Sequence, residues 1–172
     1  MRYRDRVRYR PPSRRVARLN RVIGRLAAVG LMPRDTVELE VAGRRTGQPR
    51  RVALVVTEYE GDRYLVSLAG EAEWVRNARA AGLRVTLRRW RAQRVCLHEV
   101  PADQRAPILK AYLSKRATSK SPEYEAREFF GVPVDATLDD LAAIAPHYPV
   151  FRIEPERSPL RTGTRVAPPM RG

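Results

Sequence analysis

The sequence predicts an α+β fold in which five or six antiparallel strands form a barrel-like sheet with helices at its periphery. Three observations lead to this prediction: short segments of strand-like alternation, glycine-containing turns between them, and apolar residues at helical spacing near both ends of the chain. The 172 residues suit a single domain, which at this size buries about 70% of its unfolded surface without disulfides or a metal.

The N-terminal part is strongly basic. Residues 1–12, MRYRDRVRYRPP, place arginine at nearly every second position, which predicts a flexible basic arm. From Ser13 to Gly30 the spacing predicts a basic amphipathic helix, with these apolar residues on one face: Val16, Leu19, Val22, Ile23, Leu26 and Ala27. Two interpretations stay open, a helix that covers the core with its arginines in solvent and a helix that rests on an anionic membrane surface.

Five strand-like segments follow, over residues 36–41, 51–59, 63–69, 83–90 and 93–100. In the first, Val37, Leu39 and Val41 alternate with polar side chains, the pattern of a half-buried strand. Gly61 and Asp62 are expected to form the hairpin turn between the second and third strands. A helix over 72–81, ended by glycine, is expected between the third strand and the fourth.

The last third reads as mostly helical. PADQRAPILKAYL, residues 101–113, places Ile108, Leu109, Tyr112 and Leu113 on one helix face. Thr137 is a suitable N-cap for LDDLAAIA, and PVFRI at 149–153 is the last predicted strand. We therefore expect one domain over 13–154 and a disordered tail rich in proline and arginine over 155–172.

The formal net charge of +15 attracts nucleic acid, an anionic membrane or a polyanionic ligand. Cys96 is the only cysteine, so no disulfide forms within the chain, and a zinc site has no support. No apolar run is long enough to span a bilayer and no secretory signal is evident, so we expect a cytoplasmic protein. No catalytic triad or Walker motif is present, so difficult chemistry would belong to a bound cofactor.

The turn VAGRRTGQPRR, residues 41–51, is a candidate anion site. Two glycines can expose successive backbone N–H groups that form an anion-binding concavity. Side-chain donors surround them: Arg44, Arg45, Arg50, Arg51 and the hydroxyl of Thr46. An exposed arginine-rich turn without a ligand explains the same residues equally well.

A second element lies downstream, in SLAGEAEWVRNARAAG. Helical spacing sets Trp74, Asn77 and Ala78 near one face, where a tryptophan and an asparagine could flank a flat ring. Taken alone, Trp74 is better explained as a core anchor.

Together the two motifs, over residues 36–100, resemble the deazaflavin-dependent nitroreductase family, which uses coenzyme F420, and PVFRI is typical of a subgroup. The resemblance implies a split β-barrel of about six mostly antiparallel strands that binds the reduced deazaflavin in a groove. The family often has proline where this chain has Ala53, and an N-P pair where it has AAG. These differences leave FMN, or haem, as alternative ligands.

The resemblance also assigns roles to residues. The turn would grip the phosphate and acidic tail of the coenzyme through Arg44, Arg45, Thr46, Gly47 and Arg50. The following strand would contact the ring through the backbone of Val52, Ala53 and Leu54. The remaining cofactor contacts would come from the loop Ser67, Leu68, Ala69 and Gly70 and from the helix residues Trp74, Asn77 and Arg79.

The implied function is hydride transfer from reduced F420 to an electrophilic small molecule such as a quinone or nitroaromatic, with no catalytic acid or base assigned. The resemblance also allows a homodimer, and the N-terminal helix allows peripheral contact with the inner face of the membrane. The alternative is a non-enzymatic module that binds nucleic acid through its arginine arm. That arm carries only Tyr3 and Tyr9 as stacking residues, and it lacks the motifs of RNA-binding modules.

Overall fold

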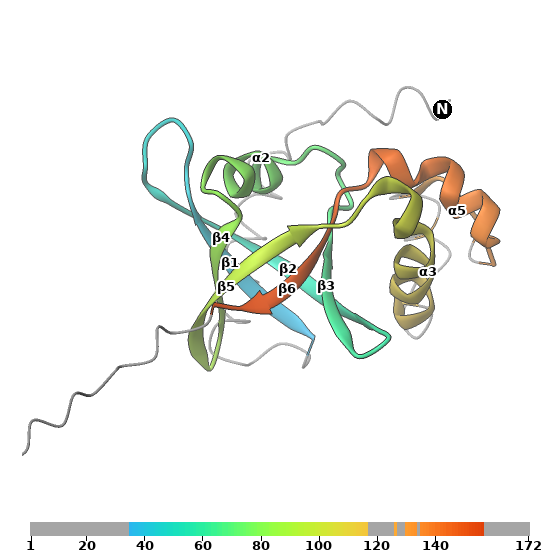
Figure 1. Ribbon diagram of the computed structural model, residues 1–172, viewed down its shortest axis with the longest axis horizontal. Helices are drawn as coiled ribbons and strands as arrows, with labels where there is room; N and C mark the ends of the chain where they lie inside the picture. The colour runs from blue at the N-terminus through green and yellow to red at the C-terminus, as the bar shows by residue number, and fades with distance from the viewer. Residues whose placement is uncertain (1–34, 117–125, 127–129, 134, 157–172) are drawn as a thin grey trace, which may run out of the picture.

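The computed structural model describes residues 35–116, 126, 130–133 and 135–156, and its centre is a closed antiparallel barrel (Figure 1). Around the barrel the strands follow the order β1-β2-β3-β6-β5-β4. Their bounds are β1 Thr36–Ala42, β2 Pro49–Tyr59, β3 Asp62–Val66, β4 Arg84–Arg89, β5 Arg91–Glu99 and β6 Val150–Pro155. This confirms the predicted α+β split barrel; the predicted arm, amphipathic helix and most of the tail lie outside the described residues.

The interior of the barrel is filled by the apolar face of each strand. Leu39, Leu65 and Val95 are fully buried there, as expected where every second residue of a strand points inward. Helix α2, Glu73–Ala80, lies across the end of the barrel next to the β1–β2 turn (Figure 1). Trp74 packs from this helix edge-on against Phe151 of β6, with the ring centroids 5.4 Å apart.

A second core joins the outside of the barrel to a helical layer. The layer consists of η2 Ala102–Gln104, α3 Arg105–Arg116, α5 Leu138–Ile144 and η4 Ala145–His147. The four residues predicted to share one face of α3 are all buried in this core: Ile108, Leu109, Tyr112 and Leu113. Thr137 caps α5 in a reciprocal capping box with Asp140, as its position predicts.

Several predicted boundaries were wrong. Tyr59 pairs with Asp62, so the β2–β3 turn is Glu60–Gly61, and both of its residues have positive φ. The third strand ends at Val66, and the residues after it form a loop. Trp90 alone connects β4 to β5, with φ of +55°.

The first strand is buried on both faces rather than one. Thr36 and Glu38, on the face opposite Val37 and Leu39, are only 7% and 2% exposed. No helix among the described residues combines the length and the apolar character needed to cross a membrane.

Candidate functional site

The β1–β2 turn is held together by its own backbone hydrogen bonds. The N–H groups of Thr46 and Gly47 donate to the carbonyl of Gly43, and the N–H of Gly43 donates to the carbonyl of Gln48. The N–H of Gln48 donates to the Thr46 hydroxyl oxygen. These N–H groups therefore donate to acceptors within the turn itself. The predicted concavity of successive free N–H groups does not form. Any anion bound here must be held mainly by side chains.

Asn77 connects the turn to α2. Its Oδ1 accepts hydrogen bonds from the backbone N–H of Arg44 at 3.2 Å and from Nη1 of Arg44 at 3.0 Å. Nη1 of Arg44 also lies 2.7 Å from Oε2 of Glu73. The hydrogen bond from Arg44 holds the pKa of the Glu73 carboxyl below its usual value, and the same bond raises the pKa of Arg44. Arg44 and Asn77 thus fix the turn against the helix.

The other predicted arginines of the turn behave differently. Arg45 and Arg50 are exposed and make no ion pair or side-chain hydrogen bond within the described part of the chain. A Cβ on Gly43 would lie 3.3 Å from both Cγ and Nε of Arg50, so glycine at this position leaves room for the Arg50 side chain across the turn. Two guanidinium groups remain available for an anion at this end of the barrel.

The strand that follows has an uncovered edge at Ala53. Val52, Ala53 and Leu54 pair with β1, whereas pairing of β2 with β3 begins only at Val56. The N–H of Val56 donates to the Asp35 carbonyl on the β1 side, at 2.7 Å. Because backbone groups alternate between the two edges of a strand, the N–H and C=O of Ala53 point away from β1. In the described structure no strand pairs with that edge.

The loop after β3 is a tight turn packed on η4. The Ser67 hydroxyl donates to the carbonyl of Gly70 at 2.6 Å, and the Ser67 N–H donates to the carbonyl of Pro149. Gly70 has a φ of +60°, and a Cβ there would lie 3.1 Å from the His147 carbonyl oxygen. Ser67 is buried and Ala69 is exposed. The loop is therefore closed by the Ser67 hydroxyl and attached to the segment between η4 and β6.

Arg79 is engaged by acidic partners of its own chain. It contacts Glu71 at 2.6 Å and Glu99 at 2.8 Å, and Glu99 also contacts Arg105 at 3.2 Å. The hydrogen bond with Glu99, followed by the one with Glu71, raises the pKa of Arg79. Its predicted contact with a cofactor stays a prediction, and the structure gives Arg79 a role in joining α2 to β5 and α3.

The predicted residues therefore form two sets. Turn, strand edge and loop contribute accessible groups, whereas Trp74 and Asn77 are buried, at 8% and 5% exposure. Two residues outside the predicted set also shape the site: Glu73, which pairs with Arg44, and Gly43, where an added Cβ would crowd the Gln48 carbonyl and the Arg50 side chain. Their sequence signals were an acidic residue in the first turn of a helix and the first glycine of GRRTG. The described residues contain no group of three or more metal-ligating side chains.

The comparison with protein families finds a match over most of the chain. A family model described as F420H(2)-dependent quinone reductase matches residues 10–133. The comparison with curated proteins gives no match.

The chain is also similar to solved structures. One is described as a domain-swapped dimer, with 16% identity, a TM-score of 0.46 and coverage of 81% of this chain and 96% of the other. A protein of unknown function from Agrobacterium tumefaciens has 13% identity and a TM-score of 0.49, and the match covers 78% of this chain and 54% of the other. A structure described as an F420-H2 dependent reductase has 18% identity, a TM-score of 0.45 and coverage of 72% and 96%.

Proposed function

The chain belongs to the F420H(2)-dependent quinone reductase family, and from this premise we propose that it transfers a hydride from reduced F420 to a quinone or nitroaromatic acceptor. The family makes the protein an oxidoreductase with reduced F420 as its cofactor. The nature of the acceptor and the residues that hold the coenzyme are the proposed part.

The observation that supports the proposal most directly is the pair Arg45 and Arg50. Both are exposed on the turn that Asn77 fixes to α2, and neither makes an ion pair or a side-chain hydrogen bond with another described residue. The coenzyme implied by the family carries a phosphate and a glutamate tail, and guanidinium groups bind both kinds of anion through paired hydrogen bonds. The donor set of this turn therefore fits the coenzyme's anionic end.

The other predicted groups have distinct tasks in this proposal. When bound, the reduced deazaflavin supplies the hydride that the acceptor takes up. The uncovered edge of β2 at Ala53 offers one backbone donor and one acceptor to a flat polar ring. The Ser67–Gly70 loop is closed by the Ser67 hydroxyl and attached by the Ser67 N–H to the carbonyl of Pro149, and it is the third group of proposed cofactor contacts. Trp74 supports the site from the core, because its ring packs on Phe151.

Further proposals concern the organisation, the assembly and the location of the protein. The chain forms one domain over 13–154 flanked by a basic arm and a tail, and this domain pairs as a homodimer in the cytoplasm. Residues 13–30, which the sequence predicts to form a basic amphipathic helix, would contact the inner face of the membrane, where lipophilic quinones partition. The arginine-rich surface, with a net charge of +15, attracts the anionic coenzyme.

Titration of the purified protein with F420, followed by the fluorescence of the coenzyme, tests the assignment. Arg45→Ala and Arg50→Ala should each weaken binding by about 1.5–3 kcal/mol, the usual contribution of a charge-assisted hydrogen bond. Arg63→Ala is the matched control, because it removes the same charge from the far end of the barrel. Unchanged affinity in both turn variants, or tighter binding of FMN than of F420, would reject the proposal.

A further inference from the structure

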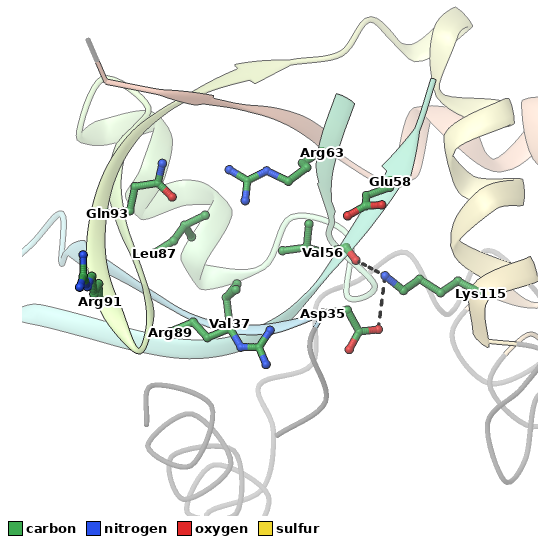
Figure 2. Close-up of a pocket in the computed structure, with 10 residues that line it drawn as sticks. All are labelled: Asp35, Val37, Val56, Glu58, Arg63, Leu87, Arg89, Arg91, Gln93 and Lys115. Atoms are coloured by element: carbon green, nitrogen blue, oxygen red, sulfur yellow. Dashed lines mark hydrogen bonds and ion pairs between the residues drawn. The ribbon is translucent and has the colours of Figure 1, made fainter. Parts of the chain in front are cut away.

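The barrel has a pocket at the end opposite to α2. Its volume is about 350 Å³, and the pocket is lined by Asp35, Val37, Val56, Glu58, Arg63, Leu87, Arg89, Arg91, Gln93 and Lys115 (Figure 2). These residues come from the beginnings of β1, β3 and β5, from the ends of β2 and β4, and from α3. The β1–β2 turn lies at the other ends of β1 and β2, so the pocket and the proposed cofactor grip are separate sites.

Basic side chains outnumber acidic ones around the pocket by four to two. Nζ of Lys115 donates to the carbonyl of Val56 at 2.8 Å and lies 3.4 Å from Oδ2 of Asp35, so these two charges are matched (Figure 2). Arg63 and Arg91 make no ion pair or hydrogen bond with any other described residue. Figure 2 shows the Arg63 guanidinium extending toward the middle of the opening. Arg63 therefore offers a guanidinium without a described partner at the middle of the opening, and Arg91 offers a second one at its rim, on β5.

The inner wall of the pocket is apolar. Val37, Val56 and Leu87 belong to the barrel core and are also pocket-lining residues. Gln93 adds an amide that can donate to an anion or accept from a hydroxyl. A ligand that satisfies all of these groups has an apolar body that rests on the core side chains and a negatively charged group at the arginine rim.

We infer that this pocket binds a small organic anion with an apolar body, of the class of aromatic phosphate monoesters and carboxylates. The two arginines favour this class because the planar guanidinium pairs with both phosphate and carboxylate oxygens. Inorganic anions should bind more weakly than organic ones, because they have no apolar part to contact this wall. The inference does not depend on the proposed redox function.

Phenyl phosphate is a suitable probe, and Trp90 is a suitable reporter. Trp90 is one of two tryptophans in the chain and lies between the pocket residues Arg89 and Arg91. Its indole N–H signal in a ¹H–¹⁵N correlation spectrum can be assigned with Trp90→Phe. We expect a saturable shift of this signal with phenyl phosphate, and binding at least about tenfold weaker for inorganic phosphate and for benzyl alcohol.

Variants decide whether the arginines hold the probe. Arg63→Gln and Arg91→Gln should each weaken phenyl phosphate binding by about tenfold or more, while F420 titration stays as in the wild type. Arg45→Gln should weaken F420 binding and leave phenyl phosphate binding as in the wild type. Failure of the cofactor assignment and failure of this inference are therefore distinguishable. The inference is overturned if both pocket variants bind like the wild type, if benzyl alcohol binds as tightly, or if no shift appears up to about 10 mM probe.

Discussion

At the scale of single residues, the two neighbouring arginines of the turn have different roles in the proposed site. Arg44 forms an ion pair with Glu73 and a hydrogen bond with Asn77. Arg45, its neighbour in sequence, makes no such contact, so its guanidinium is available to a ligand. From sequence, the motif GRRTG predicts that this turn holds the coenzyme, and that stays a prediction. The motif could not separate the roles of the two arginines, because that depends on which of them faces α2, an element 29 or more residues away along the chain.

Asn77→Ala should test the connection between turn and helix. The substitution removes the acceptor of the Arg44 backbone N–H, so we expect the free energy of unfolding to fall by about 1–3 kcal/mol. F420 binding should weaken as well, because the turn that carries Arg45 and Arg50 loses its support. Urea unfolding and fluorescence titration measure the two effects.

Asn77→Asp is the matched control for that substitution. It keeps an oxygen in the place of Oδ1, so it should retain most of both stability and coenzyme affinity. If Asn77→Ala bound F420 as tightly as the wild type, Asn77 would have no positioning role for the coenzyme.

At the scale of elements, the sequence predicts a strand over residues 63–69, but the structure ends β3 at Val66 and forms a loop before α2. The segment RYLVSLA alternates like a strand along its full length, but pairing with β6 ends at Val66. The Ser67 N–H still donates to the Pro149 carbonyl, but the Ser67 hydroxyl bonds to the Gly70 carbonyl and turns the chain away from the sheet. Side-chain hydrogen bonds of this kind compete with strand formation, and an alternation pattern does not reveal them.

Glycine substitutions in two loops should separate backbone strain from steric contact. Gly61 and Gly70 both have positive φ, but only at Gly70 would a Cβ approach another group, the His147 carbonyl oxygen at 3.1 Å. Gly61→Ala should therefore cost about 1–2 kcal/mol of stability through φ alone. Gly70→Ala should cost about 1 kcal/mol more, because the contact adds an overpacking penalty.

Thermal or urea unfolding of the two glycine variants supplies the comparison. Equal losses in both would show that η4 moves freely away from the loop. In that case, the loop would not be held in place by His147.

At the scale of the whole molecule, the fold class was predictable because the strand segments, the α3 face and the α5 cap are local patterns. The closure of the barrel was not, because β1 pairs with β4 and β6 lies between β3 and β5. Those pairings join distant segments, and no turn between neighbours determines them. The network of Glu71, Arg79, Glu99 and Arg105 is likewise invisible in the sequence, although it connects α2, β5 and the helical layer.

This network predicts a specific pH dependence of stability. The hydrogen bond from Arg79 lowers the pKa of Glu99 in the folded protein. The ionised carboxylate therefore stabilises the fold fully above its unfolded pKa of about 4.3, and this contribution is lost as pH falls through the lower folded pKa. Glu99→Gln should be less stable than the wild type by about 1 kcal/mol at pH 7, and the difference should shrink toward pH 3.

Urea unfolding at pH 7, 5 and 3 measures that difference. Glu58→Gln is the control, because Glu58 is exposed and has no ion-pair partner among the described residues. A constant difference between Glu99→Gln and the wild type across this range would contradict the assignment of the stabilisation to the ionised carboxylate.

The position of β6 has a consequence for synthesis on the ribosome. This strand, Val150–Pro155, is the last strand described, yet it fills the place between β3 and β5. Until it has been translated, both neighbours expose an unpaired edge, which is a template for pairing with other chains. The nascent protein must therefore remain shielded or unpaired while about 50 residues between β5 and β6 are added, at roughly 5–20 residues per second. The barrel therefore cannot close before β6 has been synthesised.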